Sequence, residues 1–477
     1  MARHDLDRSQ LRCDAETMRW AGACNDPAMG STWRRIRVAR RPLVVIVVCG
    51  VLAAGCGSSD DGDENAVQAP STTEVPTTTS TSVAPSSSTT TMPASTTTTS
   101  STTTTTTSIP TDPAVSTAPI EACHFPPNAF TNVGLGIPRS DVLAPSVGTI
   151  TIGTLFVDFD DAEATRTTED VFALLDPLVP EQFAAMSYGQ LSVEFAPHFE
   201  WLRLSQPSAH YGDSITRSDT HLAWIQEAVD LADATVDFSG VDLVLVIANP
   251  DAAAVPFGPV FASTNPTYGY RADGTTFTTG ITSGVDLTSW GGTWLVHELG
   301  HAMSLADLYI YGDPWPETHR FVGDWSLMGR IDGSAPEYFA LERWQLGWIE
   351  DEQVICHLDG ELTVEIEAVE TAGGAKAIVI PTNAGGLGGS DTEAVVIESR
   401  RAIGYDERLA RDGALVMVAD SGIASGAGPV TVAAGTGNTY KTDVALQPGD
   451  SYSYGPVTVT VLGRTDTSDV IQVTVSR

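Results

Sequence analysis

The chain has 477 residues, of which 60 are Asp or Glu and 25 are Lys or Arg, so its formal net charge at pH 7 is −35. Such an acidic chain lacks the basic surface that nucleic acids or anionic membranes require, and this excludes both as electrostatic partners. The length allows more than one folded domain.

The first 56 residues are organised like an export signal. Arginines in residues 34–41 precede an apolar run at residues 43–54, and small residues lead to Cys56. This order is typical of a secretory signal, and the run is shorter than the ~20 residues of a membrane-spanning helix. The position of Cys56 resembles a bacterial lipobox, which predicts lipidation of Cys56 and an extracellular protein anchored to the cell membrane. Ordinary secretion with cleavage nearby is the alternative.

Residues 57–120 are rich in Ser, Thr and Pro and contain few large apolar side chains. Such a segment cannot bury enough apolar surface to offset the entropy lost on ordering. We therefore expect a disordered linker between the lipid anchor and the folded part of the chain.

Residues 121–350 suffice for one sizeable domain. Their apolar runs and periodic segments predict strands at residues 149–159, 191–195 and 243–247, and helices at residues 169–186 and 221–232. Residues 281–290 are predicted to form a loop. This order predicts an α+β domain with a mixed sheet and a functional site at the sheet edge.

The most informative pattern is HELGH, which begins at His297. His297 and His301 are four residues apart, so on a helix they share a face and can bind one metal ion. Glu298 can serve as general base for a water molecule on that ion, and Asp307 can complete the three protein ligands of an open zinc site. A surface helix with two histidines on one face is the alternative interpretation.

Further motifs accompany this pattern in a fixed order. HELGHAMSLADLY at 297–309 is followed by GDWSLMG at 323–329, SAPEYFALERWQLGWIE at 334–350 and AVVIESRRAIGYDERLARDGALVMVAD at 394–420, and is preceded by LFVDFD at 155–160, MSYGQL at 186–191, Trp201 and HYG at 210–212. Over roughly residues 145–420 the chain resembles the secreted bacterial metalloproteases of the immune inhibitor A family.

This resemblance implies a zincin-like (metzincin-like) fold and zinc-dependent endopeptidase activity. It implies that His297 and His301 bind zinc, that Glu298 is the catalytic base, and that Met328 lies in the turn beneath the metal site.

One position departs from the family pattern HExxHxxGxxD/H. Ser304 stands where that pattern has glycine, and serine adopts the left-handed backbone of a sharp turn only at a steric cost. Asp307 is the expected third ligand, and Asp313, Glu317 and Asp324 are the alternatives.

Other polar side chains have weaker functional interpretations. Tyr309 and Tyr311 could stabilise an oxyanion or could simply be buried tyrosines. The resemblance also raises the prospect of bound Ca²⁺, and two acidic clusters are candidates, although solvated loop carboxylates are the more common explanation. The clusters are Asp158, Asp160 and Asp161, and Asp237 with Asp242.

Residues 351–477 are predicted to form an all-β, sandwich-like domain. Its predicted strands lie at residues 362–366, 377–380, 394–397, 415–418 and 457–462. The sequence is compatible with either packing against the catalytic domain or substrate binding as its role.

The cysteines agree with export. Cys123 and Cys356 are the pair that remains once the leader is removed and Cys56 is lipidated, and an oxidising compartment favours a disulfide between them. An inhibitory thiolate from Cys123 on the metal is the alternative.

The expected function is that of a surface-tethered zinc endopeptidase, a monomer whose partners are protein or peptide substrates. A non-catalytic surface binding protein that retains the fold and a cell-wall amidase are the alternatives.

Overall fold

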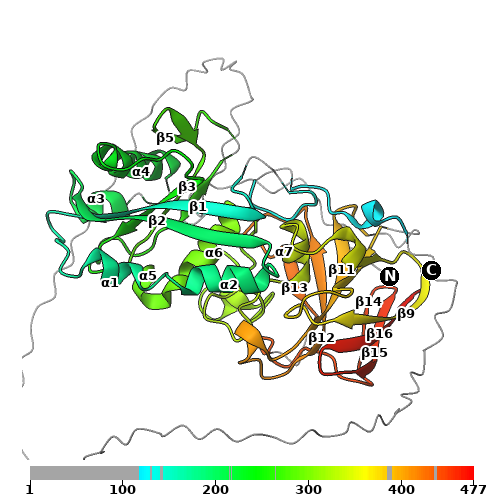
Figure 1. The fold of residues 1–477 in the computed structure, drawn as a ribbon. Helices are drawn as coiled ribbons and strands as arrows, with labels where there is room; N and C mark the ends of the chain where they lie inside the picture. The colour runs from blue at the N-terminus through cyan, green and yellow to red at the C-terminus, as the bar shows by residue number, and fades with distance from the viewer. Residues whose placement is uncertain are drawn as a thin grey trace, which may run out of the picture. The chain divides into compact units, whose positions relative to one another are not determined.

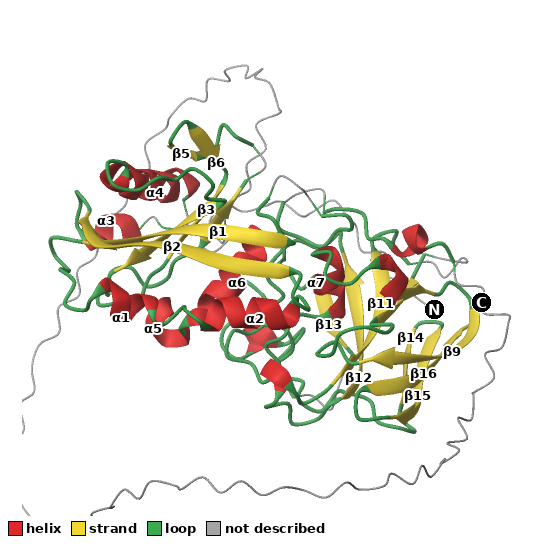
Figure 2. Ribbon diagram, in the orientation of Figure 1, coloured by secondary structure: helices red, strands yellow, loops and turns green. Residues whose placement is uncertain are grey.

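A computed structural model describes residues 118–476, except 129–131, 140–142, 214, 216, 264, 384–388 and 434–437 (Figure 1). The described residues belong to one unit of the chain. They form a mixed α+β structure, in agreement with the sequence prediction (Figure 2). The predicted leader with Cys56 and nearly all of the predicted linker lie outside the described residues.

The first sheet has five strands in the order β2-β1-β3-β7-β4. Its bounds are β1 (Gly148–Asp158), β2 (Leu191–Arg203), β3 (Leu243–Ala248), β4 (Val260–Ala262) and β7 (Thr279–Thr282). Strands β1, β2, β3 and β7 are parallel, and β4 is antiparallel to β7. Every residue of β3 is buried, because helices cover both faces of this parallel region. A hairpin of β5 (Tyr270–Ala272) and β6 (Thr275–Phe277) precedes β7.

Helices lie on both faces of this sheet (Figures 1 and 2). Their bounds are α1 (Thr168–Phe172), α2 (Leu178–Met186), α3 (Ser208–Gly212), α4 (Ser218–Ala232), α5 (Asp286–Trp290) and α6 (Gly292–Ala302). Alternate residues of β3 enter two hydrophobic cores: Leu245 packs in the core that contains Leu295 and Leu299 of α6, and Val246 packs in the core with Trp224 of α4. The sheet therefore provides a rigid support for α6.

Three local predictions in this region need correction. The helix predicted at 169–186 is two helices, because Pro177 lacks the N–H that would continue α1 and instead precedes α2. The predicted strand at 191–195 extends to Arg203, since β2 pairs along the whole of β1. Residues 281–290, predicted as a loop, contain the end of β7 and helix α5. The buried carboxylate of Asp286 accepts hydrogen bonds from the N–H groups of Gly284 and Leu287 and so stabilises the start of α5.

The C-terminal region contains two further sheets, with strand orders β13-β12-β11-β10-β8 and β14-β15-β16-β9. The first comprises β8 (Val354–Cys356), β10 (Ala377–Pro381), β11 (Glu393–Arg400), β12 (Gly413–Asp420) and β13 (Val430–Val432); the second comprises β9 (Gly360–Glu367), β14 (Ser451–Tyr454), β15 (Val457–Arg464) and β16 (Ser468–Val475). Residues of both sheets, such as Ile397 of β11 and Val473 of β16, share one core. Each predicted C-terminal strand lies within one of these strands.

The segments before and after residue 350 are joined extensively. One hydrophobic core contains α6 and residues of β10 to β12. A disulfide joins Cys123 to Cys356 across 233 positions of sequence. Arg400, at the end of β11, forms buried ion pairs with Glu370, Glu398 and Asp406. The short helix α7 (Ala340–Gln345) lies at this junction, and the N–H of its first residue donates to Glu398.

Among the described residues, no helix combines the length and the apolar character needed to cross a membrane.

Candidate metal centre

Helix α6 carries both histidines of the HELGH motif. Gly291, with φ of 57°, marks the sharp turn that separates α5 from α6. The apolar residues Trp294, Leu295 and Leu299 are buried in the core and fix the rotation of the helix. His297 and His301 therefore share one face, and their ring centroids lie 4.7 Å apart.

The chain reverses immediately after α6, at Ser304. Ser304 has φ of 97°, a left-handed backbone conformation that favours glycine. Its hydroxyl and its carbonyl both accept hydrogen bonds from Gln345 Nε2, at 2.9 and 3.4 Å. Serine at this position therefore makes the turn that the glycine of the family pattern would make, and buried hydrogen bonds offset part of its strain.

This turn brings Asp307 back to the two histidines. His297 Nε2 lies 3.1 Å from His301 Nε2, and each of them lies 3.2 Å from Asp307 Oδ1. Ligand atoms about 2.0–2.1 Å from a tetrahedral zinc ion lie about 3.3–3.4 Å apart, so the observed triangle has the size that zinc requires. Asp307 is 5% exposed, and its Oδ1 contacts both histidine nitrogens at ion-pair distance. A buried anionic oxygen of this kind needs a positive charge beside it, which either a protonated histidine or a metal ion at the centre of the triangle supplies; the size of the triangle fits a metal ion.

Backbone carbonyls orient the two imidazole rings. His297 Nδ1 lies 3.1 Å from the carbonyl oxygen of Leu327, and His301 Nδ1 lies 2.7 Å from that of Leu305. In each ring the Nδ1–H donates to the carbonyl, so Nε2 is the nitrogen directed at the centre of the triangle. Both histidines are thus oriented to bind a metal through Nε2 once that nitrogen is deprotonated.

The electrostatics of the triangle favour a cation. Burial by itself raises the pKa of Asp307, but the neighbouring charges of His301 and His297 outweigh burial and hold that pKa below its usual value. Burial lowers the pKa of His301, but Asp307 and Glu298 outweigh burial and raise that pKa to about 9. The same carboxylates that stabilise a proton on His301 would attract a divalent ion.

Glu298 lies beside the triangle without joining it. Its Oε2 accepts a hydrogen bond of 2.9 Å from the N–H of Val260, the first residue of the edge strand β4. Burial raises the pKa of Glu298, and the charges of His297, His301 and Asp307 are close enough to influence it. The carboxylate is therefore held next to the candidate metal position and remains available for proton transfer.

Met328 forms the support beneath helix α6. Its side chain is fully buried, and a Cβ on Gly300 would lie only 2.7 Å from Met328 Sδ. The hydroxyl of Tyr338 would lie 2.8 Å from the same Cβ, and it donates to the carbonyl of Val296. Gly300 thus allows the close contact that fixes the height of α6 above residues 325–329.

The alternative third ligands are not at the triangle. Asp313 pairs with Arg320, and Asp324 pairs with Arg330. Among the described residues, only His297, His301 and Asp307 form a group that could hold a metal ion, so Glu317 does not contribute.

Both tyrosines lie beside the triangle. The Tyr311 hydroxyl donates a hydrogen bond to Asp307 Oδ2, so it orients this candidate ligand. The Tyr309 ring lies 6.4 Å from that of His297, and burial together with the charge of nearby Asp307 raises the pKa of the Tyr309 hydroxyl.

The acidic residues named for calcium have other partners. Asp158 and Asp160 pair with Arg203, and Asp161 accepts two hydrogen bonds from Ser208. Asp242 accepts from the N–H of Thr151, and Asp237 from that of Ser239. None of them joins a metal-holding group in the described part of the chain.

Contacts from distant sequence complete the site, and sequence reasoning missed them. Val260 holds Glu298, and Ser425 and Gly426 hold the backbone of Asp307. Residues 421–429, the loop between β12 and β13, consist mostly of glycine, alanine and serine, and this composition does not identify a partner.

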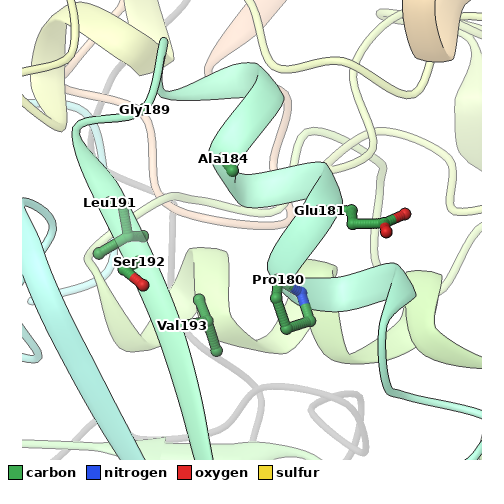
Figure 3. Close-up of a pocket in the computed structure, with 7 residues that line it drawn as sticks. All are labelled: Pro180, Glu181, Ala184, Gly189, Leu191, Ser192 and Val193. Carbon is green, nitrogen blue, oxygen red and sulfur yellow. The ribbon is translucent and has the colours of Figure 1, made fainter.

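A shallow hollow lies between α2 and β2 (Figure 3). It is lined by Pro180, Glu181, Ala184, Gly189, Leu191, Ser192 and Val193. None of these residues belongs to the His–His–Asp triangle, so we do not assign chemistry to this hollow.

The candidate metal site is interpreted mainly from its geometry, because comparisons with known proteins gave no match. No protein-family model matches the chain. A search of curated proteins likewise finds no match.

Proposed function

We propose that the protein is a zinc-dependent endopeptidase with a zincin-like (metzincin-like) catalytic region. The observation that carries the proposal is the buried triangle of His297 Nε2, His301 Nε2 and Asp307 Oδ1, with Glu298 next to it. The motif resemblance to the immune inhibitor A metalloproteases supports the same assignment.

The residues of the site have separate roles. His297, His301 and Asp307 would hold the ion, which is one ligand fewer than tetrahedral zinc takes. A zinc ion held there would supply Lewis acidity, which polarises a peptide carbonyl and lowers the pKa of a water molecule. Glu298 takes a proton from water at its carboxylate and delivers it to the leaving amine. The N–H of Val260 keeps that carboxylate in place during the transfer.

The edge strand β4 is one reason to propose a peptide as the substrate. Pro259 O accepts from Thr282 N and Ser263 N donates to Thr278 O, so these residues face β7. Backbone groups alternate along an antiparallel strand, so the carbonyl of Val260 and both backbone groups of Ala262 point to the outer edge. The N–H of Val260 points the same way but already donates to Glu298. An extended peptide can add to such an edge through main-chain hydrogen bonds. This edge begins at the residue that holds Glu298, which would place a peptide bond beside the base.

The proposal includes export and a lipid anchor at Cys56, inferred from the sequence. The buried Cys123–Cys356 disulfide supports an oxidising compartment. Mass spectrometry of the mature N-terminus tests the anchor: a diacylated Cys56 is expected, and a mature chain that begins elsewhere without lipid would contradict it.

The direct test of activity compares casein cleavage by the wild type, by Glu298→Gln and by chelator-treated protein. We expect Glu298→Gln to retain zinc and lose at least about 100-fold in rate, since a general base contributes about 10²–10⁴-fold. Chelation should abolish cleavage and added zinc should restore it. Equal activity in all three samples would refute the peptidase assignment, and cleavage of peptidoglycan alone would favour the amidase.

A further inference from the structure

The third candidate ligand stands on a segment that belongs to no helix or strand. Residues 305–309 follow the Ser304 turn and lie in no helix or strand. On either side of Asp307, the N–H of Leu305 donates to the carbonyl of Gly300 and that of Leu308 to the carbonyl of Met328. His297 and His301, by contrast, are fixed by α6. What holds Asp307 therefore determines whether the triangle keeps its shape.

Both backbone groups of Asp307, its N–H and its carbonyl, form hydrogen bonds with the loop between β12 and β13, residues 421–429. The N–H of Asp307 donates to Ser425 Oγ at 2.8 Å, and the carbonyl of Asp307 accepts from Gly426 N at 3.0 Å. Tyr311 N donates to Gly426 O at 2.9 Å, and Ile310 forms an antiparallel bridge with Ala427. The loop thus acts as a short strand partner for residues 307–311.

The carboxylate of Asp307 is ordered by the same contacts. Tyr311 donates its hydroxyl to Oδ2, and Ser425 Oγ lies 3.5 Å from the Tyr311 oxygen. Because Ser425 Oγ already accepts from Asp307 N, its own proton is available to Tyr311. A chain of hydroxyls from Ser425 through Tyr311 thus satisfies Oδ2, and only Oδ1 faces the histidines.

The loop packs closely against Tyr311 and is itself held in place by a side chain from elsewhere in the chain. Gly426 has φ of +70°, and a Cβ there would lie 2.1 Å from the Tyr311 ring. The loop itself is anchored by the Asn128 side chain, which donates to the carbonyls of Ser421 and Ile423 at 2.8 and 3.1 Å. The loop is therefore a fixed element against which Tyr311 packs.

We propose that the β12–β13 loop positions the third metal ligand, with Ser425 and Tyr311 as positioning residues for Asp307. This inference rests on the proposed zinc site and assigns a role to the C-terminal region: it completes the metal centre. Partners that orient metal ligands in this way typically contribute about 10–100-fold to metal affinity.

The test measures zinc affinity of the purified full chain by competition with a chromophoric chelator. Ser425→Ala and Tyr311→Phe remove the two hydroxyls, and Ser425→Thr retains the oxygen. Ser421→Ala is the matched control, because Ser421 is a buried serine of the same loop whose hydroxyl has no hydrogen-bond partner among the described residues. The absorption spectrum of the Co²⁺-substituted protein reports the coordination geometry independently of activity.

We expect Ser425→Ala and Tyr311→Phe to weaken zinc binding by about 10–100-fold and to alter the Co²⁺ spectrum. Ser425→Thr and Ser421→Ala should resemble the wild type in both. Wild-type affinity in Ser425→Ala, or equal weakening in Ser421→Ala, would overturn the inference. If Ser425→Ala does not fold, wild-type affinity in Tyr311→Phe would overturn it. A wild-type chain that binds no zinc would instead refute the proposed function itself.

Discussion

Gly300→Ala tests whether the contact between helix α6 and its support sets the position of the histidines. The added Cβ would lie 2.7 Å from Met328 Sδ and 2.8 Å from the Tyr338 hydroxyl. Ordinary contacts are about 3.5–4.0 Å, so helix and support must separate by about 1 Å. Met328 is fully buried, and the Tyr338 hydroxyl is held by the Val296 carbonyl at 2.6 Å, so neither has free space to move into.

The expected magnitude follows from two opposing effects. Overpacking a core costs about 1–3 kcal/mol, whereas replacing a helical glycine by alanine gains about 0.5–1 kcal/mol. We expect a net loss of up to about 2.5 kcal/mol in the free energy of unfolding, together with weaker zinc binding because the movement carries His301 with it. Urea unfolding and chelator competition measure the two effects.

A second substitution separates this mechanism from a general effect. In Tyr338→Phe the obstructing hydroxyl is absent, and the cost of Gly300→Ala should fall by about 0.5 kcal/mol or more, which a double-mutant cycle detects. A Gly300→Ala variant that is more stable than the wild type and binds zinc with unchanged affinity would refute the reasoning.

Three further predictions concern stability. Replacing both Cys123 and Cys356 by Ala should lower the free energy of unfolding by about 2–5 kcal/mol, because the disulfide closes a long loop; an unchanged urea midpoint would contradict this. Ser304→Gly should be more stable than Ser304→Ala by about 0.5–1 kcal/mol, since both lack the hydroxyl but only alanine keeps the strained Cβ; the opposite ranking in thermal unfolding would contradict the strain. Burial lowers the pKa of His221 from 6.5 to about 3, so the folded state disfavours its protonation, and stability should fall as the pH drops from 6.5 towards 3. His221→Gln should flatten that part of the curve of unfolding free energy against pH, and parallel curves for the two proteins would show that His221 is not responsible.

Features encoded by neighbouring residues could be predicted from the sequence. The apolar run of β3 and the predicted strands of the C-terminal region correspond to strands of the structure. The candidate ligands are also local, because His297, His301 and Asp307 lie within one short segment and a single turn at Ser304 brings them together.

Features that depend on distant partners could not be predicted. The edge strand β4 has only three residues, too few for a periodic signal, and its hydrogen bond to Glu298 spans 38 positions. Ser425 lies 118 positions from Asp307, and nothing in its local sequence indicates that contact. The split between α1 and α2 was missed because the apolar pattern continues across Pro177 and obscures the break.

The proposed function requires that two imidazoles and one carboxylate bind a single zinc ion. X-ray absorption spectroscopy at the zinc edge, on purified full chain with its metal content measured, examines this coordination itself. We expect one zinc per chain with two imidazole nitrogens at about 2.0–2.1 Å and oxygen ligands at similar distance, and the loss of one oxygen ligand in Asp307→Ala. Substoichiometric metal, or a spectrum with no imidazole scattering, would contradict it.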